Sequence, residues 1–304
     1  MDMELSNIYI YALKELGFDD KAIETAILLV KNDVVETVEE FIDFVNFNIE
    51  ERKFPQITNP FDVRVIKKAV AKARKNEWKI VHSVSISDDN YPQKILQSLI
   101  GHFPDLSYKG SIKNIERKTI LITGSSSITN NAKMASKYMG KLFAANGYNI
   151  LSSFSEGCEQ SSILGCTEAS GISTFFLPDS IEHLSAKEIK VIQGELEAGR
   201  STLISVSNSP RANKVSIEDT YRYIMAISDC VIVPQLSFND DVMRFIINYL
   251  DAGKPVYFIE YKTESDAEYD CSILSATRKV KYISSKTALR DIKDAIGEAR
   301  EFIF

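Results

Sequence analysis

Two loops rich in glycine and serine are the parts of this sequence best suited to bind an anion. The first is Thr123-Gly124-Ser125-Ser126-Ser127-Ile128-Thr129, and the second is Ser152-Ser153-Phe154-Ser155-Glu156-Gly157-Cys158-Glu159. Each loop follows an apolar run and precedes a helical pattern. Small side chains let backbone N–H groups approach a ligand at the start of a helix, a geometry that favours phosphate. Neither loop matches a dinucleotide-binding or Walker signature, so ordinary strand-to-helix turns stay an alternative.

Basic residues gather in two other places. The loop Asn208-Ser209-Pro210-Arg211-Ala212-Asn213-Lys214, with Arg222 after it, forms a modest basic cluster. The helical pattern of residues 61–79 carries a larger group, at Arg64, Lys67, Lys68, Lys72, Arg74, Lys75 and Lys79. Clustered Lys and Arg could bind a nucleic-acid backbone. Charges on one helix surface are also typical of a solvated face, which is the alternative for residues 64–79.

The histidines and cysteines do not form a catalytic or metal-binding pattern. Histidines stand at positions 82, 102 and 183, and cysteines at 158, 166, 230 and 271. No carboxylate–histidine spacing suggests a catalytic triad, and a zinc site requires closer pairs of ligands. Cys158 at a helix start could have a lowered pKa, but Glu156 and Glu159 oppose that effect. We therefore expect no catalytic residue, no metal and no cofactor.

The elements that must position these loops are strands that alternate with helices. Short β-rich runs lie at Thr119–Thr123, Tyr148–Ser152, Ile172–Leu177, Thr202–Val206, Cys230–Pro234, Val256–Ile259 and Val280–Ile283. Amphipathic stretches such as 131–146 separate them, and a last helix is expected at 286–302. This alternation predicts an α/β fold with a doubly wound, mostly parallel sheet covered on both faces. The loops after Thr123 and Ser152 are then expected to lie on the same edge of the sheet, where such folds bind ligands.

The N-terminal region has a different character. Residues 1–51 are helical in pattern and carry three Lys or Arg against thirteen Asp or Glu. Residues 61–79 are expected to form a third main helix, with Val63, Ile66, Val70 and Ala73 facing inward. We therefore predict a small, acidic helical domain over residues 1–79 and a second domain over residues 80–304.

Composition restricts the class of protein further. The chain has 304 residues, 44% of them hydrophobic and 26% charged, as in an ordinary globular protein. Its formal charge is −6, so any surface for nucleic acid must be a local patch. There is no signal-peptide pattern and no apolar run long enough to span a membrane. The four cysteines have no paired close spacing, so they do not indicate a fold held together by disulfides. We expect a cytoplasmic protein.

Six short segments follow one another in a characteristic order. They are Tyr91-Pro92-Gln93-Lys94-Ile95-Leu96, Pro104-Asp105-Leu106-Ser107-Tyr108-Lys109-Gly110, the two serine-rich loops, Thr220-Tyr221-Arg222-Tyr223-Ile224-Met225-Ala226-Ile227-Ser228 and Leu250-Asp251-Ala252-Gly253-Lys254-Pro255-Val256-Tyr257-Phe258. This order, over roughly residues 73–296, resembles the DNA-processing protein A (DprA/Smf) family.

The resemblance implies a Rossmann-like fold for residues 80–304 and suits a helical, SAM-like domain at residues 1–79. Members of the family bind single-stranded DNA, form dimers and hand the DNA to the RecA recombinase during transformation, and they are not regarded as enzymes. The C-terminal winged-helix domain of many relatives is not expected here, because the chain ends at Phe304 after its last strand and helix. The resemblance therefore implies single-stranded DNA, a RecA-type recombinase and a second copy of the chain as partners.

The sequence departs from the family pattern at the candidate pocket. Ser126 replaces an arginine, Ser153 replaces a glycine and Glu159 replaces an aspartate, while the family's histidine falls on Ile163. Glu156, Asp240 and Asp241 add negative charge, which disfavours a backbone phosphate there. The candidate ligand-binding residues are therefore Gly124, Ser125, Ser126, Ser152, Ser153 and Gly157 in the loops, and Lys109, Arg211, Lys214, Arg222 and Lys254 outside them.

Two further functions stay open. The same fold superfamily includes nucleotide sensors and nucleotide hydrolases, in which Glu156 and Glu159 could act as acid and base. Alternatively, the pocket is vestigial and the acidic segment 1–51 docks a basic protein. Three aromatic residues, Phe154, Tyr221 and Tyr223, could stack on bases in a DNA-binding protein, or pack in the core.

Overall fold

The computed structural model divides the chain into two compact units, Met1–Ile80 and Val81–Phe304. It describes residues 3–30, 35, 37–75, 81–98, 103–181, 184, 186–206, 211–237, 239–261 and 280–301. Each unit has a hydrophobic core of its own.

The first unit is a group of helices. They are α1 (Met3–Glu15), α2 (Asp20–Val30), α3 (Val38–Glu50) and α4 (Val63–Lys75). Thr37 and Glu40 form a capping box that satisfies two backbone N–H groups at the start of α3. The helices bury their apolar faces against one another, with Phe41 and Ile66 among the fully buried residues.

The helix predicted over residues 61–79 is α4, and residues 76–79 lie outside the described residues. Ile66, Val70 and Ala73 face the core as expected. The inward prediction was wrong for Val63, which is 48% exposed. Val63 is the first residue of α4, and the first residue of this helix in the core cluster is Ile66, one turn later.

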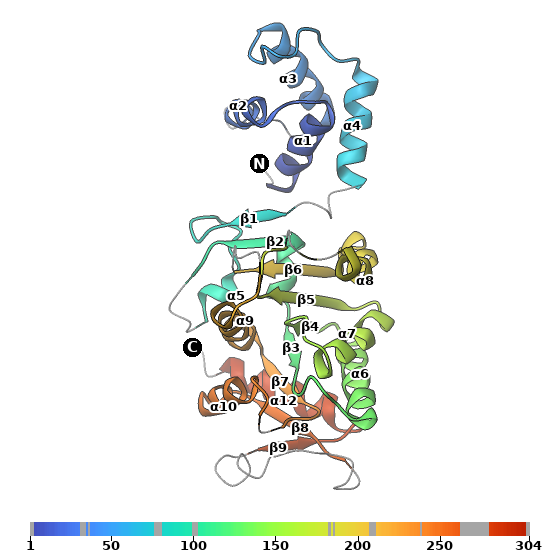
Figure 1. The fold of residues 1–304 in the computed structure, drawn as a ribbon, viewed down its shortest axis with the longest axis vertical. Coiled ribbons are helices and arrows are strands. Elements are labelled where there is room, and N and C mark those ends of the chain that lie inside the picture. Colours follow the sequence, from blue (N-terminus) through green and yellow to red (C-terminus); the bar gives the residue numbers. More distant parts are fainter. Residues whose placement is uncertain are drawn as a thin grey trace. The chain divides into compact units, whose positions relative to one another are not determined.

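The second unit is built on one sheet of nine strands in the order β1-β2-β6-β5-β4-β3-β7-β8-β9 (Figure 1). The strands are β1 (His82–Val84), β2 (Leu106–Gly110), β3 (Thr119–Ile122), β4 (Asn149–Ser152), β5 (Ile172–Leu177), β6 (Ser201–Ser205), β7 (Cys230–Val233), β8 (Val256–Ile259) and β9 (Lys281–Ile283). In the sheet order from β6 across to β9, every pair of neighbouring strands is parallel. The strands β3 to β9 are the seven predicted runs, so the doubly wound, mostly parallel sheet is confirmed.

Strands β1 and β2 were not predicted. They extend the sheet beyond β6 with antiparallel pairing, in which Ser107 lies opposite Ser205. β1 has only three residues, and β2 pairs with a strand that follows it by about 95 residues. Short strands held by such distant partners leave little local periodicity in the sequence.

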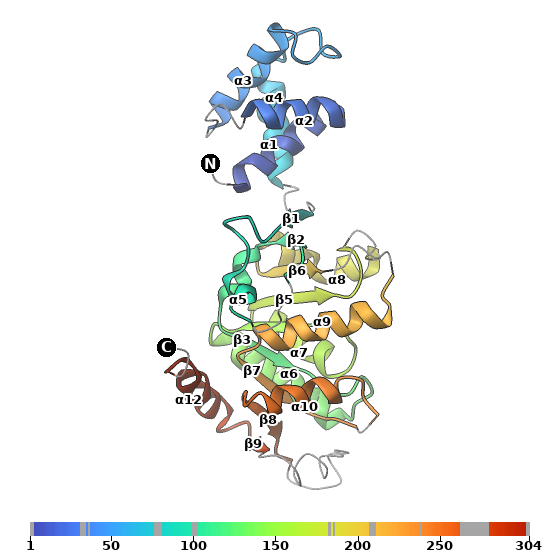
Figure 2. The same cartoon turned by 90° about the vertical axis from the view of Figure 1, so that its left-hand side faces the viewer.

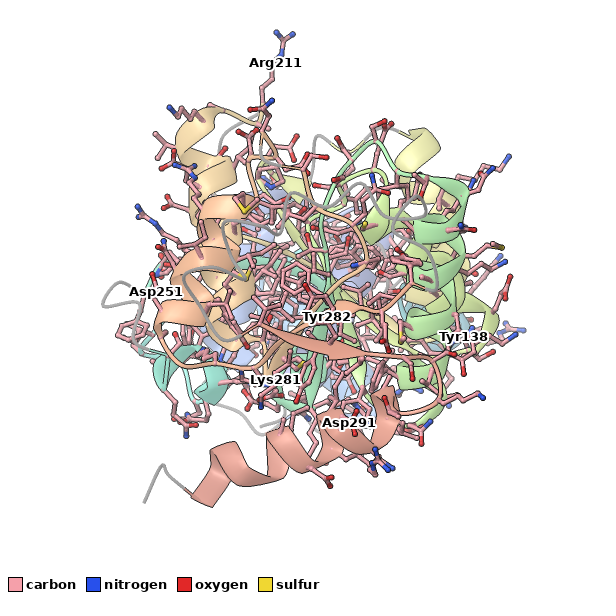
Figure 3. All side chains as sticks on the ribbon, turned by 90° about the horizontal axis from the view of Figure 1, so that it is seen from below. Tyr138, Arg211, Asp251, Lys281, Tyr282 and Asp291 are labelled. Carbon is pink, nitrogen blue, oxygen red and sulfur yellow. The ribbon has the colours of Figure 1, made fainter. Side chains whose placement is uncertain are left out.

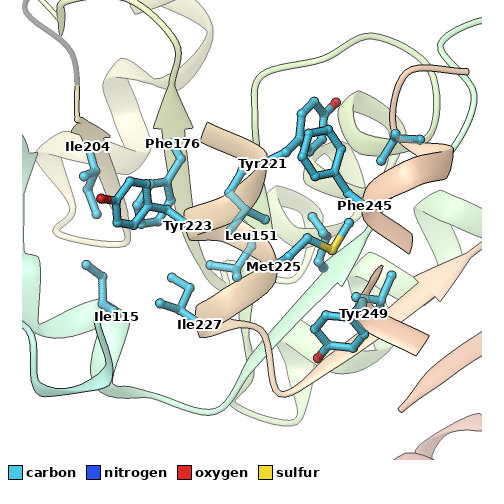
Figure 4. Close-up of a cluster of buried hydrophobic side chains, with 14 of the residues drawn as sticks. Ile115, Leu151, Phe176, Ile204, Tyr221, Tyr223, Met225, Ile227, Phe245 and Tyr249 are labelled. Atoms are coloured by element: carbon cyan, nitrogen blue, oxygen red, sulfur yellow. The ribbon is translucent and has the colours of Figure 1, made fainter. Parts of the chain in front are cut away.

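Helices cover both faces of the sheet. Figure 1 shows α6 (Asn130–Ala145), α7 (Cys158–Glu168) and α8 (Ala186–Glu197) on one side, and α5 (Gln93–Leu96), α9 (Lys214–Ile227) and α10 (Met243–Asp251) on the other. The 3-10 helix η2 (Ile112–Glu116) joins β2 to β3, and α12 (Ala288–Glu301) shares a core cluster with α6 and with strands that include β8 and β9. Figure 2 shows α9 and α10 in front of the sheet. Their buried side chains, including Tyr221, Tyr223, Phe245 and Tyr249, form a large core cluster with the strands beneath (Figure 4).

α6 and α7 cross with almost no space between their backbones. A Cβ atom on Gly165 of α7 would lie 1.9 Å from the carbonyl oxygen of Lys137, and one on Gly140 of α6 would lie 2.0 Å from that of Ser162. Real Cβ contacts are never this short. The crossing therefore requires glycine in both helices.

Candidate functional site

The chain order reverses at strand β3, and the two serine-rich loops lie at the carboxyl edge of the sheet beside this point. β4, β5 and β6 follow on one side of β3, whereas β7 and β8 lie on its other side. The loops after β3, β4 and β7 are hydrogen-bonded to one another: the N–H of Ser125 donates to the carbonyl of Gln235 (2.9 Å), and the N–H of Cys158 donates to that of Ser125 (3.2 Å). The prediction that the turns after Thr123 and Ser152 share one edge is confirmed. Ligands bind at such switch points in open α/β sheets.

The two glycines of these loops allow the loop backbones to touch. Gly157 has a φ of +75°, and a Cβ atom there would lie 2.4 Å from the carbonyl oxygens of both Ser125 and Ser126. A Cβ atom on Gly124 would lie 2.0 Å from the carbonyl oxygen of Gln235. These positions require glycine because backbone occupies the place of a side chain. Gly124 and Gly157, both candidate ligand-binding residues, are therefore needed for the conformation of the loops.

Ser152 and Ser153 point their hydroxyls inward, toward the carboxylate of Glu159. Ser152 Oγ and Ser153 Oγ donate to Glu159 Oε2 at 3.1 and 2.8 Å, and the Ser153 N–H donates to the same oxygen at 2.5 Å. Thr123 Oγ1 donates to Oε1 at 2.7 Å. All four residues are buried. The two serines thus hold an internal carboxylate, and the structure does not present their hydroxyls to a ligand.

Burial raises the pKa of Glu159, against the opposite effect of its hydrogen bonds from Thr123, Ser153 and Ser152. The folded protein therefore keeps the Glu159 proton at pH values where the unfolded chain, with a carboxyl pKa near 4.5, has released it. Since the folded state binds more protons in that range, stability falls as pH rises from about 4.5 through the folded pKa.

We expect Glu159→Gln to remove this fall. The free energy of unfolding of the variant, relative to the unchanged protein, should increase as the pH rises from about 4.5 through the folded pKa of Glu159. Urea unfolding at several pH values measures the difference. A difference that stays constant over the range would contradict the prediction, whatever its absolute value.

Tyr221 extends this network toward the carboxyl edge. Its hydroxyl lies 3.3 Å from Ser153 Oγ and 3.2 Å from Ser155 Oγ. Its ring stacks on Phe245, with ring centroids 5.1 Å apart. Tyr221 and Tyr223 are both buried, so the structure supports core packing for them instead of base stacking. Phe154 is only partly buried, has a φ of +69° and contacts Phe175.

The acid–base pair that a hydrolase would require is not assembled. Glu156 is exposed in the loop after β4, whereas Glu159 is 1% exposed and satisfied by four hydrogen bonds. A carboxylate enclosed in this way does not reach a substrate. Within the described part of the chain, no three His, Cys, Asp or Glu side chains are placed to hold a metal ion. His102, His183 and Cys271 lie outside that part.

Asp240, from the loop after β7, sits against the loop after β3. Its Oδ2 atom accepts hydrogen bonds from Ser125 Oγ (2.5 Å) and from the N–H of Ser237 (2.6 Å). Ser125 is buried, whereas Ser126 is exposed. The sequence analysis placed Asp240 near the candidate pocket, but nothing in the sequence indicated that its carboxylate would accept a hydrogen bond from the loop after β3.

The candidate basic residues fall into three groups. Arg211 and Lys214 are exposed at the start of α9, which follows β6 and so begins at the carboxyl edge; Arg211 extends away from the body of the unit (Figure 3). Lys109 is buried in β2, at 8% exposure. Lys254 precedes β8 and donates to the carbonyl of Ala226 (2.9 Å), at the opposite, amino edge. Neither Lys109 nor Lys254 joins the exposed cations of the carboxyl edge.

Arg222 belongs to a basic cluster that includes one residue the sequence analysis missed. Arg244 of α10 pairs with Glu218 of α9 at 2.7 Å. The Arg244 hydrogen bond, with the nearby charges of Arg244, Lys214 and Arg222, holds the pKa of Glu218 below its ordinary value. We call Lys214, Arg222 and Arg244 the α9 basic cluster. Arg222 also pairs with Asp219 (3.4 Å), and its side chain is 61% exposed.

Three basic residues of α4 are paired with carboxylates of their own unit. Lys67 pairs with Glu39 (3.0 Å), Lys72 pairs with Glu15, and Arg64 pairs with Asp62. These pairs are solvent-exposed and individually weak, and Lys68 and Arg74 are further exposed cations of the same helix. A nucleic-acid surface and a solvated face both stay predictions for α4.

None of the described helices has the length and apolar character needed to cross a membrane.

Comparisons with known proteins agree with this fold. The sequence model of a family described as DNA recombination-mediator protein A matches residues 82–291. The structure resembles DNA processing protein A of Streptococcus pneumoniae, with a TM-score of 0.59 and 17% sequence identity, over 93% of this chain and 97% of the other. It also resembles DNA processing protein A of Helicobacter pylori, whose structure is described by its single-stranded DNA binding mode (TM-score 0.55, 18% identity, 72% of this chain and 96% of the other). A search of curated proteins found no significant match.

Proposed function

Because the chain belongs to the DNA recombination-mediator protein A family, we propose that it is a DNA-processing protein that binds single-stranded DNA and catalyses no reaction. The observation that carries the proposal is the extent of the family match, which runs from β1 to the first residues of α12 and so includes the whole sheet. The Helicobacter pylori relative, named for its single-stranded DNA binding mode, supports the ligand. The buried state of Glu159 supports the absence of hydrolysis.

The α9 basic cluster, with Arg211, is the surface proposed to hold the DNA backbone. Its cations are exposed and come from two adjacent helices, α9 and α10, which both begin at the carboxyl edge. A strand held by phosphate contacts binds with steep salt dependence and little sequence preference. Gly124, Ser125, Ser126, Ser152, Ser153 and Gly157 then shape the edge beside the strand.

We expect the full-length protein to bind a labelled oligonucleotide at micromolar concentration in about 50 mM salt, measured by fluorescence anisotropy. Arg222→Ala should weaken binding for all sequences and reduce the slope of log affinity against log salt by about one, because one phosphate contact is lost.

Arg290→Ala is the matched control. Arg290 is also an exposed helical arginine paired with a neighbouring aspartate, Asp291, but it lies on α12. Equal losses in the two variants would show that the effect is general electrostatics. Absence of binding by the unchanged protein under these conditions would overturn the proposed function.

The proposal extends to partners. A family member that binds single-stranded DNA is expected to act as a homodimer in the cytoplasm and to pass the DNA to a RecA-type recombinase during DNA uptake or recombination. The acidic helical unit remains a second candidate surface for a protein partner. Sedimentation of the protein with and without oligonucleotide tests the dimer, and recombinase assembly on coated DNA tests the transfer.

A further inference from the structure

The switch point beside β3 has two features of an anion site. The loop after β3, which leads to helix α6, supplies the hydroxyl of Ser125. The loop after β7 adds the backbone N–H of Ser237, which lies on the other side of the switch point. An oxygen atom that met both donors would sit between the carboxyl ends of β3 and β7.

The chain itself places such an oxygen there. Asp240 Oδ2 receives both donors, at 2.5 Å from Ser125 Oγ and 2.6 Å from the nitrogen of Ser237. Ser237 Oγ also lies 3.4 Å from Ser125 Oγ, so the three groups close a small ring of contacts. An ionised carboxylate oxygen with two short donors is a good mimic of a phosphate oxygen.

No cation on the loop after β3 offsets this charge, because the loop residue after Ser125 is serine, Ser126. Asp240 also lies close enough to act on Cys158 at the start of α7: burial raises the pKa of its thiol to about 12, and interactions with Glu159 and Asp240 raise it further. A phosphate that approached Ser125 would meet the charge of Asp240 at close range, in a partly buried place where screening is weak.

We infer that Asp240 is a specificity-determining residue that occupies the phosphate position at the switch point and excludes phosphate groups from it. The inference deepens the proposed function, on which it rests for its role in DNA binding. The strand's phosphates are then held by the α9 basic cluster and not by the loop after β3. Removal of Asp240 frees Ser125 Oγ and the Ser237 N–H for an external anion.

The test is binding of inorganic phosphate to the full-length protein, followed by thermal unfolding. A ligand that binds only the folded state raises the unfolding temperature in proportion to the logarithm of its concentration above the dissociation constant. We expect Asp240→Ala, which removes charge and makes room, to bind phosphate at least about tenfold more tightly than the unchanged protein. Chloride at the same ionic strength should not reproduce the effect.

Two further variants make the result specific. Asp240→Asn keeps the size of the side chain and a hydrogen-bond acceptor but removes the charge. It replaces the alanine variant in the test if that variant does not fold, and it should also bind phosphate more tightly than the unchanged protein. Asp241→Asn removes the same charge at the adjacent, exposed residue and should gain much less. Equal phosphate affinity in all four proteins, or an equal gain in Asp241→Asn, would overturn the inference.

Oligonucleotide anisotropy on the same proteins separates this inference from the proposed function. If the unchanged protein binds no oligonucleotide but Asp240→Ala gains phosphate, the proposed function fails and the inference stands. If the unchanged protein binds oligonucleotide and removal of Asp240 gives no gain in phosphate affinity, the inference fails and the proposed function stands.

Discussion

Gly165→Ala should lower the free energy of unfolding by about 3 kcal/mol, although alanine is the better helix former. The new Cβ atom would stand 1.9 Å from the carbonyl oxygen of Lys137, and 2.9 Å from the backbone nitrogen of Lys141. Neither neighbour is a flexible side chain, so α6 and α7 must move apart to admit one methyl group. Urea unfolding of the full chain, followed by circular dichroism, measures the loss.

Gly194→Ala should change the free energy of unfolding in the opposite direction. Gly194 lies in α8, is exposed and has no atom within 4 Å of an added Cβ. Alanine there should raise the free energy of unfolding by up to about 1 kcal/mol through helix propensity. If both variants were stabilised, α6 and α7 would not cross as closely as the structure shows.

Asp229→Ala should cost about 3 kcal/mol, because it leaves a largely buried lysine without its counter-charge. Asp229 Oδ2 accepts from Lys94 Nζ (2.7 Å) and from the N–H of Thr119 (2.7 Å), and the two charged side chains are only 22% and 18% exposed. Lys94 Nζ also donates to the carbonyl of Arg117 (2.9 Å). These hydrogen bonds and the ion pair hold the segment that begins at Tyr91 against the starts of β3 and β7.

Asp291→Ala is the comparison for that loss. Asp291 pairs with Arg290 at 3.1 Å, but the arginine side chain is 72% exposed, so the pair should contribute less than about 1 kcal/mol. Both variants remove a carboxylate from an ion pair, but the partner of Asp229 is more buried and Asp229 also accepts the N–H of Thr119. Equal shifts in the unfolding midpoint would contradict the prediction that the buried contacts of Asp229 contribute more than an exposed ion pair.

Much of the sheet could be predicted from the sequence. Strands such as Cys230–Val233 and Val256–Ile259 are buried on both faces and therefore appear as continuous apolar runs. The parallel order then required the loops after Thr123 and Ser152 to share one edge. Strands β1 and β2 were not predicted, because β2 joins the sheet through β6, far along the chain, and the short β1 joins it through β2.

The sequence by itself therefore determined the class of fold, the edge that carries the loops and the family resemblance. Those features depend on local hydrophobic period and on the order of segments, which are both written along the chain.

Only the tertiary structure decided what each polar side chain does at that edge. Ser152 and Ser153 hold Glu159, and Asp240 bonds to Ser125, 115 residues away in sequence. Lys254 lies at the other edge, a position that its place before a strand could have indicated. The physical reason is that a hydroxyl or carboxylate takes whichever partner folding brings within hydrogen-bonding distance, and burial makes that partner obligatory.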